Sequence, residues 1–279
     1  MSFENTLITG NTFISVLNSG STSYIQPNTI IHGYCLEVMK NIPDKSIDMV
    51  LCDLPYEVTS CEWDVIIPFD KLWEQYNRIV KPNGAILLFG TEPFSSHLRM
   101  SNLKDYRYDW IWNKLSTSNF ANVSKMPLNC YEIISVFYKQ LPTYNPQMTD
   151  ADPKKVRPID KTYTNKSKTN HQHSGITKKY SEGYDIKKRY PIKIINISSR
   201  EKECNSHNKQ HETQKPVSLG EYLIKTYSNE GDVILDNTMG VGSFGVSATN
   251  LNRKFIGIEK EEKYFDVCKI RLSGFTVIS

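Results

Sequence analysis

Residues 47–57 read Ile-Asp-Met-Val-Leu-Cys-Asp-Leu-Pro-Tyr-Glu, and our interpretation of the whole chain starts from this stretch. A largely apolar run ends in the carboxylate of Asp53, and Pro55 and the aromatic Tyr56 follow it. This order is typical of a buried strand that opens into a rigid loop. Because open α/β sheets bind ligands outside the carboxyl ends of their strands, we expect Asp53 and Tyr56 to face a cleft. A carboxylate beside a flat ring suits a planar substrate that carries an amino group.

Asp and Pro are also ordinary turn residues, so this stretch alone is compatible with a simple turn after a strand. A second stretch favours a binding site. Residues 232–245 read Asp-Val-Ile-Leu-Asp-Asn-Thr-Met-Gly-Val-Gly-Ser-Phe-Gly, which predicts a strand, a glycine-rich turn and a helix start. Gly240 and Gly242 let the backbone approach a ligand, and helix-start amides face it. Glu259, at the end of the next predicted strand, can hold two ribose hydroxyls.

Together the two stretches resemble the catalytic and S-adenosyl-L-methionine motifs of the amino-group DNA methyltransferases. The order is that of the permuted (beta) class, in which the catalytic motif precedes the cofactor motif. Residues 53–56, Asp-Leu-Pro-Tyr, match the family's D-P-P-Y, and residues 236–242 match its D-x-F-x-G-x-G. Residues 213–216, Thr-Gln-Lys-Pro, match its T-x-K-P. The resemblance implies an α/β, Rossmann-like methyltransferase fold with a mostly parallel twisted sheet and helices on both faces.

The resemblance also assigns roles to residues. The catalytic residues it implies are Asp53, Leu54, Pro55 and Tyr56. The residues it implies for S-adenosyl-L-methionine are Thr213, Lys215, Asp236, Asn237, Thr238, Gly240, Gly242 and Glu259. We expect Glu259 to hold the ribose and Lys215 to lie near the methionine carboxylate.

Three positions depart from the family pattern. Leu54 replaces the first proline, but its backbone carbonyl can still accept a hydrogen bond from an amine. Met239 stands just before the first glycine of the cofactor motif, a change that we expect to be tolerated. Residues 33–35, Gly-Tyr-Cys, stand where the family often has Gly-Asp, which leaves the adenine side of the cofactor without its usual partner.

The predicted chemistry is methyl transfer to the exocyclic amine of a base. Hydrogen bonds to Asp53 and the Leu54 carbonyl would localise the nitrogen lone pair, which is otherwise delocalised into the ring. The base has to be flipped out of a duplex, and Tyr56 would stack against it. Asp rather than Ser at the first motif position favours adenine N6 by family resemblance. Cytosine-N4 methylation, RNA adenine methylation and a catalytically inactive nucleic-acid-binding homologue remain as alternatives.

The chain has 279 residues, which suits one large domain with an insertion. We expect an N-terminal extension at 1–28 and a methyltransferase domain at 29–279, with a target-recognition insertion at about 141–210. In this insertion long apolar runs vanish, and basic residues alternate with tyrosines, a composition typical of nucleic-acid contact. A solvated, lysine-rich insertion is the alternative. The residues predicted to bind DNA are Lys178, Lys179, Lys187, Lys188 and Arg189.

Composition limits the other function classes. No run of about 18 apolar residues exists, and residues 1–19 lack a basic region before an apolar core, so neither a membrane span nor a signal peptide is expected. The six cysteines are scattered, which suits the reducing cytoplasm of a prokaryotic or phage-type host. The spacing Cys204-x-x-His207-x-x-x-His211 lacks a fourth ligand, so no metal is predicted. The expected partner is double-stranded DNA, with self-association into a homodimer left open.

Hydrophobic periodicity places the elements coarsely. A single apolar stripe predicts a helix over residues 69–80, which residues 81–84, Lys-Pro-Asn-Gly, should end. The other predicted helices span 36–41, 95–103, 216–227, 243–248 and 261–272. The predicted strands span 29–32, 47–52, 85–89, 106–112, 132–138, 233–235 and 255–259, with a polar loop over 113–120.

Overall fold

The computed structural model describes residues 24–57, 65–118, 120–156, 185–201, 204 and 213–279. The described residues form two compact units. The larger unit comprises the residues up to Asn145 and those from Lys193 onward, and the smaller unit is Pro146–Ile192. The larger unit holds the sheet, its helices and every motif residue on which the predicted chemistry depends.

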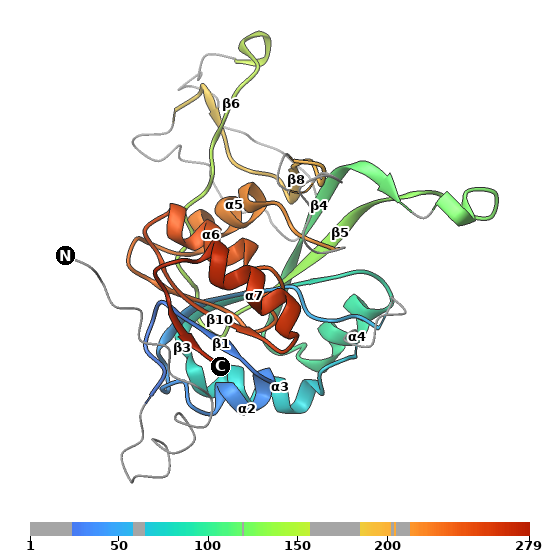
Figure 1. The fold of residues 1–279 in the computed structure, drawn as a ribbon. Coiled ribbons are helices and arrows are strands. Elements are labelled where there is room, and N and C mark those ends of the chain that lie inside the picture. Colours follow the sequence, from blue (N-terminus) through green and yellow to red (C-terminus); the bar gives the residue numbers. More distant parts are fainter. Residues whose placement is uncertain (1–23, 58–64, 119, 157–184, 202–203, 205–212) are drawn as a thin grey trace, which may run out of the picture. The chain divides into compact units, whose positions relative to one another are not determined.

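A single sheet organises the larger unit (Figure 1). Its described strands lie in the order β11-β1-β10-β9-β2-β3-β5-β4-β8. All neighbours are parallel except β5, which runs antiparallel to both β3 and β4. The bounds are β1 (Thr29–His32), β2 (Ile47–Cys52), β3 (Val80–Gly90), β4 (Tyr106–Ser118), β5 (Asn129–Phe137), β8 (Ile194–Asn196), β9 (Val233–Asp236), β10 (Lys254–Glu259) and β11 (Thr276–Ile278).

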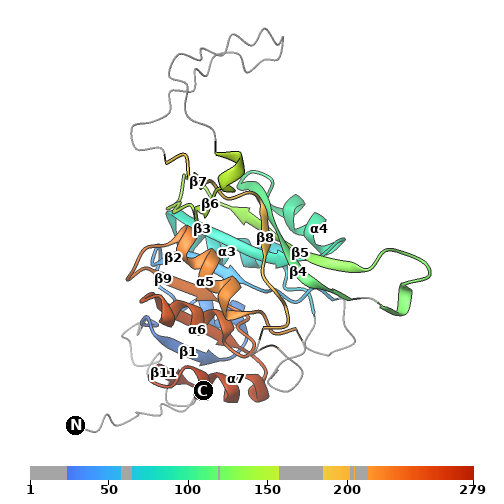
Figure 2. The same ribbon diagram turned by 90° about the horizontal axis from the view of Figure 1, so that it is seen from above.

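Helices cover both faces of this sheet, as Figures 1 and 2 show from two directions. One buried apolar cluster joins the sheet to α2 (Cys35–Met39), α3 (Phe69–Ile79) and α4 (Phe94–Ser101). A second cluster joins the opposite face to α5 (Val217–Tyr227), α6 (Ser243–Asn250) and α7 (Glu262–Arg271). The central strands are therefore buried on both sides, which explains their continuous apolar runs. The predicted fold class, α/β and Rossmann-like with a mostly parallel sheet, is confirmed.

The pairing of β2 with β9 creates the place for a ligand. Met49 of β2 lies opposite Ile234 of β9, and Val50 lies opposite Leu235. From β2 the chain continues to β3 on one side, whereas from β9 it continues to β10 on the other. Such a reversal of strand order is a topological switch point, where open α/β sheets bind ligands at the carboxyl ends of their strands.

Several element boundaries differ from the sequence prediction. The helix α3 ends at Ile79, and residues 81–84 belong to β3, whose register against β2 shifts at this point. The strand β4 continues to Ser118 through the stretch predicted as a polar loop, because Asn113 and Ser118 pair with Tyr131 and Asn129 of β5, with a shift of register between them. Backbone hydrogen bonds in a hairpin do not require apolar side chains, so hydrophobicity alone did not reveal this extension.

Two described strands of the main sheet were not predicted. The strand β11 pairs with β1 at the edge of the sheet. The strand β8 lies within the range 141–210, yet it joins the main sheet beside β4, with Ile111 opposite Ile194. The segment that separates as its own compact unit is therefore narrower than this range.

The smaller unit contains a short antiparallel pair, β6 (Thr149–Asp150) and β7 (Lys188–Arg189). It also holds the 3-10 turn η2 (Pro153–Lys155), and a second turn, η1 (Phe120–Asn122), lies at the end of the β4–β5 hairpin. Some predictions fall outside the described residues. These are most of the N-terminal extension and Lys178, Lys179, His207 and His211.

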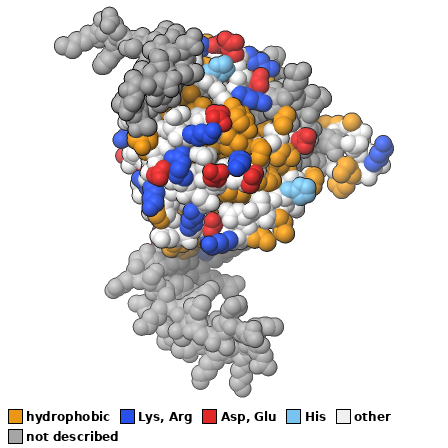
Figure 3. All heavy atoms as spheres, turned by 90° about the horizontal axis from the view of Figure 1, so that it is seen from below, with side chains coloured by type: hydrophobic (Ala, Val, Ile, Leu, Met, Phe, Trp, Pro, Cys, Tyr) orange, Lys and Arg blue, Asp and Glu red, His pale blue; other side chains and the backbone are white. Residues whose placement is uncertain are grey.

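The face that carries α2 and α3 is seen from below in Figure 3, where acidic, basic and apolar side chains are interspersed. Ion pairs within these helices account for part of the mixture, since Lys40 meets Glu37 at 2.7 Å and Lys71 meets Glu74 at 3.7 Å. Part of the positive charge on these two helices is thus neutralised locally. No helix in the part of the chain that the structure describes is long and apolar enough to cross a lipid bilayer.

Candidate active site

A cavity of about 460 Å³ opens at the carboxyl ends of β1, β2, β9 and β10. It lies at the switch point, so residues that are distant in sequence meet around it. The predicted site residues that line it are Asp53, Leu54, Pro55, Tyr56, Thr213, Lys215, Asp236, Asn237, Thr238, Gly240 and Glu259. The structure thus brings the predicted catalytic and cofactor motifs to one cavity.

Gly242 is the one predicted cofactor residue that does not line the cavity. It precedes α6 with a φ of 75°, and a Cβ there would lie 3.1 Å from the sulfur of Cys268. Glycine is therefore required at this position for the turn and for close packing against α7. Its contribution to a ligand is to let the neighbouring backbone turn toward the cavity.

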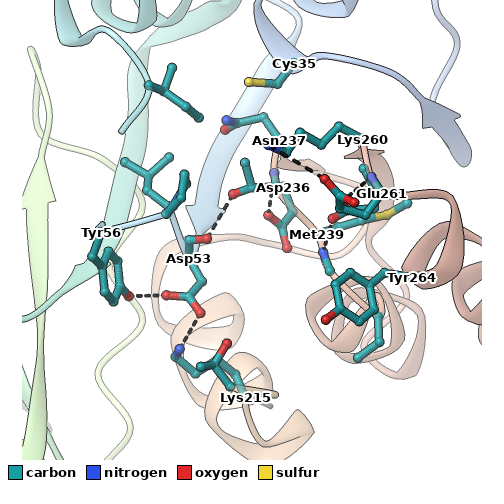
Figure 4. A pocket seen from close by; sticks show the side chains of 18 of the residues that line it. Cys35, Asp53, Tyr56, Lys215, Asp236, Asn237, Met239, Lys260, Glu261 and Tyr264 are labelled. Carbon is teal, nitrogen blue, oxygen red and sulfur yellow. Dashed lines mark hydrogen bonds and ion pairs between the residues drawn. The ribbon is translucent and has the colours of Figure 1, made fainter. Parts of the chain in front are cut away.

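Asp53 is the centre of the catalytic half of the cavity (Figure 4). The Tyr56 hydroxyl donates a hydrogen bond to Asp53 Oδ1, and the Lys215 ammonium forms an ion pair with Oδ2. The hydroxyl of Thr238 donates to the main-chain carbonyl of Asp53 at 2.9 Å. Burial raises the pKa of Asp53 above its ordinary value, and the positive charge of Lys215 offsets part of that effect. A carboxylate with a raised pKa is a better proton acceptor.

Tyr56 has its ring against Phe94 of α4, with the ring centroids 4.9 Å apart. Burial, followed by the charge of Asp53, raises the pKa of Tyr56, so its hydroxyl stays protonated and donates to the carboxylate. Phe94 covers part of the ring surface on which a flipped base was expected to stack. The structure therefore places Tyr56 where its hydroxyl holds Asp53, and its stacking against a base stays a prediction.

Lys215 has more partners than the sequence suggested. Its ammonium lies 3.4 Å from Glu132 Oε2 and 5.4 Å from the centroid of the Phe89 ring. Burial acts to lower the pKa of Lys215, but the carboxylates of Asp53 and Glu132 outweigh it and raise that pKa above its ordinary value. Lys215 is thus a buried cation held between two carboxylates. Its ammonium faces Asp53, and its predicted place near the methionine carboxylate stays a prediction.

Glu132 and Lys114 belong to the site but were missed by sequence reasoning. Glu132 comes from β5 and lines the cavity, and its Oε1 lies 3.4 Å from Lys114 of β4. Both side chains are largely buried, at 14% and 13% exposed. One signal was available in the sequence: Glu132 is a single carboxylate at the start of an otherwise apolar predicted strand. Because a buried charge requires a partner, its position indicates an ion pair.

The cofactor half of the cavity centres on Glu259, at the end of β10. Its Oε2 accepts a hydrogen bond from the Gly240 amide and its Oε1 accepts one from the Glu261 amide, both at 2.8 Å. Burial raises the pKa of Glu259, and these backbone hydrogen bonds oppose the shift. Each carboxylate oxygen has a second lone pair, so the two can still accept hydrogen bonds from vicinal hydroxyls of a ligand.

Asp236 and Asn237 end β9 between the two halves of the cavity. The Thr238 amide donates to Asp236 Oδ1 at 3.3 Å, and the Tyr76 hydroxyl donates to Asn237 Oδ1 at 2.6 Å. Burial raises the pKa of Asp236 to about 8, so the free protein holds a proton there near neutral pH. The cavity is lined by five acidic residues, which suits a ligand that carries hydroxyls and positive charge. They are Asp53, Glu132, Asp236, Glu259 and Glu261.

Residues 33–35, which depart from the family pattern, form the edge of the same cavity. The Tyr34 side chain is 44% exposed and precedes α2, whereas Cys35 is buried. Burial raises the pKa of Cys35 to about 11, so it remains a neutral thiol. This edge offers apolar and weakly polar contacts in place of a carboxylate.

The predicted DNA-binding residues that the structure describes lie in the smaller unit. The Lys188 ammonium pairs with Asp150 at 2.6 Å, and the Arg189 guanidinium donates to the carbonyls of Ile186 and Lys188. The Lys187 backbone amide donates to Asp185 at 2.8 Å. The side chains of Lys188 and Arg189 therefore have partners within their own unit, and phosphate contact would compete with these partners.

Comparison with known proteins gives one family. Residues 47–269 match a family model for DNA methylase, of the N6/N4 methyltransferases. The matched range includes residues 53–56 and the cavity residues from Asp53 to Tyr264. Type II methyltransferase M.HinfI of Haemophilus influenzae is 26% identical, with 88% of this chain and 68% of that protein covered.

Solved structures show the same fold. The M1.HpyAVI–SAM complex superposes with a TM-score of 0.58 at 22% identity, covering 88% of this chain and 98% of that one. PvuII DNA methyltransferase, described as cytosine-N4-specific, superposes with a TM-score of 0.59 at 17% identity, covering 91% of this chain and 97% of that one. At these identities the likeness establishes the fold.

Proposed function

The chain belongs to the N6/N4 DNA methylase family, and from this premise we propose that it methylates the exocyclic N6 amine of an adenine in double-stranded DNA. The methyl donor is S-adenosyl-L-methionine. The observation that carries the proposal is the position of Asp53. Its carboxylate lies at the switch point, in the same cavity as the buried acids Asp236 and Glu259.

S-adenosyl-L-methionine, when bound, supplies an electrophilic methyl group on a sulfonium. The residues at the ends of β9 and β10 suit this molecule. Glu259 accepts the ribose hydroxyls, and the turn at Gly240, which lines the cavity, lets the backbone approach the ligand closely. The carboxylate of Asp236 stabilises positive charge on the ligand, because opposite charges attract strongly in a buried site.

Asp53 and the Leu54 carbonyl accept hydrogen bonds from the two amine hydrogens of the target base. These bonds draw the nitrogen lone pair out of conjugation and aim it at the methyl group. A nitrogen–carbon bond forms as the carbon–sulfur bond breaks, with its electron pair left on sulfur. One amine proton then passes to Asp53, whose raised pKa suits it to accept a proton. Tyr56 holds the carboxylate in place through its hydroxyl.

The adenine assignment rests on Asp at the first motif position, which by family resemblance favours adenine N6. The second candidate is cytosine N4, which the likeness to a cytosine-N4-specific enzyme keeps open. Both reactions use an exocyclic amine and the same acceptor pair. They differ in the shape and hydrogen-bonding edge of the flipped base, which the cavity has to read.

The permuted motif order places the segment at about 141–210 between the catalytic and cofactor motifs, where this class carries its target-recognition region. We assign that role to the segment on its composition and on the separation of Pro146–Ile192 as a compact unit. Relatives named as type II methyltransferases support a role in restriction and modification, on DNA in a prokaryotic cytoplasm.

To decide among these functions, the protein is incubated with labelled S-adenosyl-L-methionine in two separate reactions. One reaction contains unmethylated double-stranded DNA and the other contains RNA. Mass spectrometry of the digested product distinguishes N6-methyladenine from N4-methylcytosine. We expect N6-methyladenine in DNA, with Asp53→Ala as the inactive control. If the product is N4-methylcytosine, the protein is a cytosine-N4 methyltransferase. If only RNA is labelled, the substrate is RNA and not DNA. If neither is labelled, the protein is a nucleic-acid-binding homologue without catalytic activity.

A further inference from the structure

Both oxygens of Asp53 are occupied in this structure. Oδ1 accepts from the Tyr56 hydroxyl, and Oδ2 faces the Lys215 ammonium. An ammonium in contact with a carboxylate stabilises its charged form and so reduces its ability to take up a proton. If Asp53 is to accept a proton from the target amine, the contact with Lys215 has to weaken during the reaction. This step rests on the proposed function.

A second acceptor for the ammonium is already in place. Glu132 Oε2 lies 3.4 Å from Lys215 Nζ, while Asp53 is in direct contact with the same nitrogen. Among the described residues Glu132 Oε2 is buried and has no hydrogen bond of normal geometry. Leaving a buried acceptor in this state is unfavourable, because the group has lost its hydrogen bonds to water. A short displacement of Lys215 toward Glu132 would therefore satisfy an acceptor that is unsatisfied now.

The four charged side chains that would take part in this displacement carry no net charge together. Lys114 and Lys215 carry two positive charges, and Glu132 and Asp53 carry two negative ones. When Asp53 becomes protonated, Lys215 would be a buried cation without a carboxylate unless Glu132 held it. The Lys215 side chain is only 6% exposed, so water would compensate poorly. Among the described residues, the ring of Phe89 also lies close to the ammonium, at 5.4 Å, and offers a weaker attraction.

We propose that Lys215 exchanges Asp53 for Glu132 when the target amine enters, and that Glu132 is the positioning residue that makes this exchange possible. Glu132 then acts through Lys215: it draws the ammonium off Asp53 and keeps it paired while Asp53 carries the proton. Lys114, on the other oxygen of Glu132, holds that carboxylate in its place beside the cavity.

A near-isosteric substitution tests this role. In Glu132→Gln, Lys215 is left with Asp53 as its only carboxylate, so Asp53 becomes a weaker base. We expect the maximal methyl-transfer rate to fall by about tenfold or more, within the range that proton transfer contributes. The acid limb of the pH–rate profile should move to lower pH, while cofactor affinity is retained. Glu132→Asp keeps the negative charge, so the acid limb of its pH–rate profile should stay at the wild-type pH.

Glu92→Gln is the matched control, because Glu92 is also paired to a cation, Arg99, and does not line the cavity. It should leave both rate and profile unchanged. A Glu132→Gln enzyme with the wild-type rate and an unmoved acid limb would overturn the inference. An inactive wild-type enzyme would instead overturn the proposed function, and this inference with it, so the two failures are distinguishable.

A second measurement needs no substitution and so does not depend on whether a variant folds. The wild-type protein would be crystallised with S-adenosylhomocysteine and a duplex that contains the target sequence, read first from the methylated product. We expect Lys215 Nζ within hydrogen-bond distance of Glu132 Oε2 and separated from Asp53. An ammonium still in contact with Asp53 beside the flipped base would refute the exchange.

Discussion

Thr238 donates a hydrogen bond from its hydroxyl to the main-chain carbonyl of Asp53 at 2.9 Å, although 185 residues separate the two. The same hydroxyl lies 2.9 Å from the sulfur of Cys52, the last residue of β2. The glycine-rich turn after β9 is thus tied directly to the start of the catalytic loop. Because Thr238 also lines the cofactor half of the cavity, this bond couples the two motifs mechanically.

Thr238→Val removes this bond while it keeps the size of the side chain. A net hydrogen bond contributes about 0.5–1.5 kcal/mol, so we expect the transfer rate to fall by roughly 2- to 10-fold. Thr238→Ser keeps the hydroxyl and should restore most of the rate. Single-turnover kinetics with saturating cofactor would measure both variants. Equal rates for Val and Ser would show that the bond does not position Asp53.

Asp53→Ala should abolish methyl transfer, with a loss of about 10²-fold or more, since it removes the proton acceptor. Cofactor affinity should be largely retained because Asp236 and Glu259 lie on other strands. Lys215 keeps Glu132 as a partner in this variant, so the fold should also survive. Turnover and calorimetric affinity are measured on one preparation, and near-normal turnover would contradict the role of Asp53.

The main features of this site could be predicted from the sequence because they depend on local order along the chain. An apolar run that ends in Asp53, and another that ends in Asp236, each predict a strand whose carboxyl end presents an acid. Once both strands belong to one parallel sheet, their ends meet at the same edge. The cavity confirms that the two motifs meet there.

The partners of Lys215 could not be predicted in the same way. Which carboxylates surround a buried cation depends on how strands from separate parts of the chain are ordered in the sheet. Glu132 reaches the site because β5 runs antiparallel between β3 and β4, and no residue pattern near Lys215 indicates that. The polar end of β4 was missed for a related reason, since pairing with β5 and not hydrophobicity defines it.

Glu259→Ala should weaken S-adenosyl-L-methionine binding by about 10- to 100-fold, the range expected for lost hydrogen bonds to a charged group. Binding to DNA without cofactor should change little. Glu259→Gln keeps the side-chain volume and one acceptor, so its loss should be smaller. Because Glu259 also accepts from the Gly240 and Glu261 amides, a thermal melt has to accompany the calorimetry. If the Ala variant binds S-adenosyl-L-methionine with wild-type affinity, the ribose must bind elsewhere in the cavity.

Asp236 should make cofactor binding release a proton. Its pKa in the free protein is raised to about 8, so at pH 7 roughly 0.9 of the molecules hold this proton, and about half do at pH 8. A positively charged ligand favours the ionised carboxylate and so lowers this pKa. Proton release should therefore be larger at pH 7 than at pH 8, and affinity should rise with pH through this range.

The release is measured as the dependence of the calorimetric binding enthalpy on the ionisation enthalpy of the buffer. Asp236→Asn is the control, because it keeps the side-chain shape but cannot titrate. Any protons exchanged by the ligand itself are common to both proteins, so the difference isolates Asp236. An identical buffer dependence in the wild type and in Asp236→Asn would rule out this linkage.

The last prediction concerns Lys187, Lys188 and Arg189, the described members of the basic group. Replacing all three with Ala should weaken DNA binding across many sequences and flatten its salt dependence. Each neutralised phosphate contributes about 0.9 to the log–log slope, so the slope should fall by at most about 2.7. A smaller change is expected if Lys188 keeps its pairing with Asp150 on DNA.

A control must remove the same charge elsewhere, because any loss of three positive charges weakens long-range attraction to DNA. Lys40, Lys71 and Lys269 serve this purpose, since each is partly exposed and already paired with an acid on its own helix. Their replacement with Ala should leave the slope nearly unchanged, as local pairing leaves little charge for phosphates. Equal slopes for the two triple variants would mean that only net charge matters, and the basic segment would then be a solvated insertion without phosphate contacts.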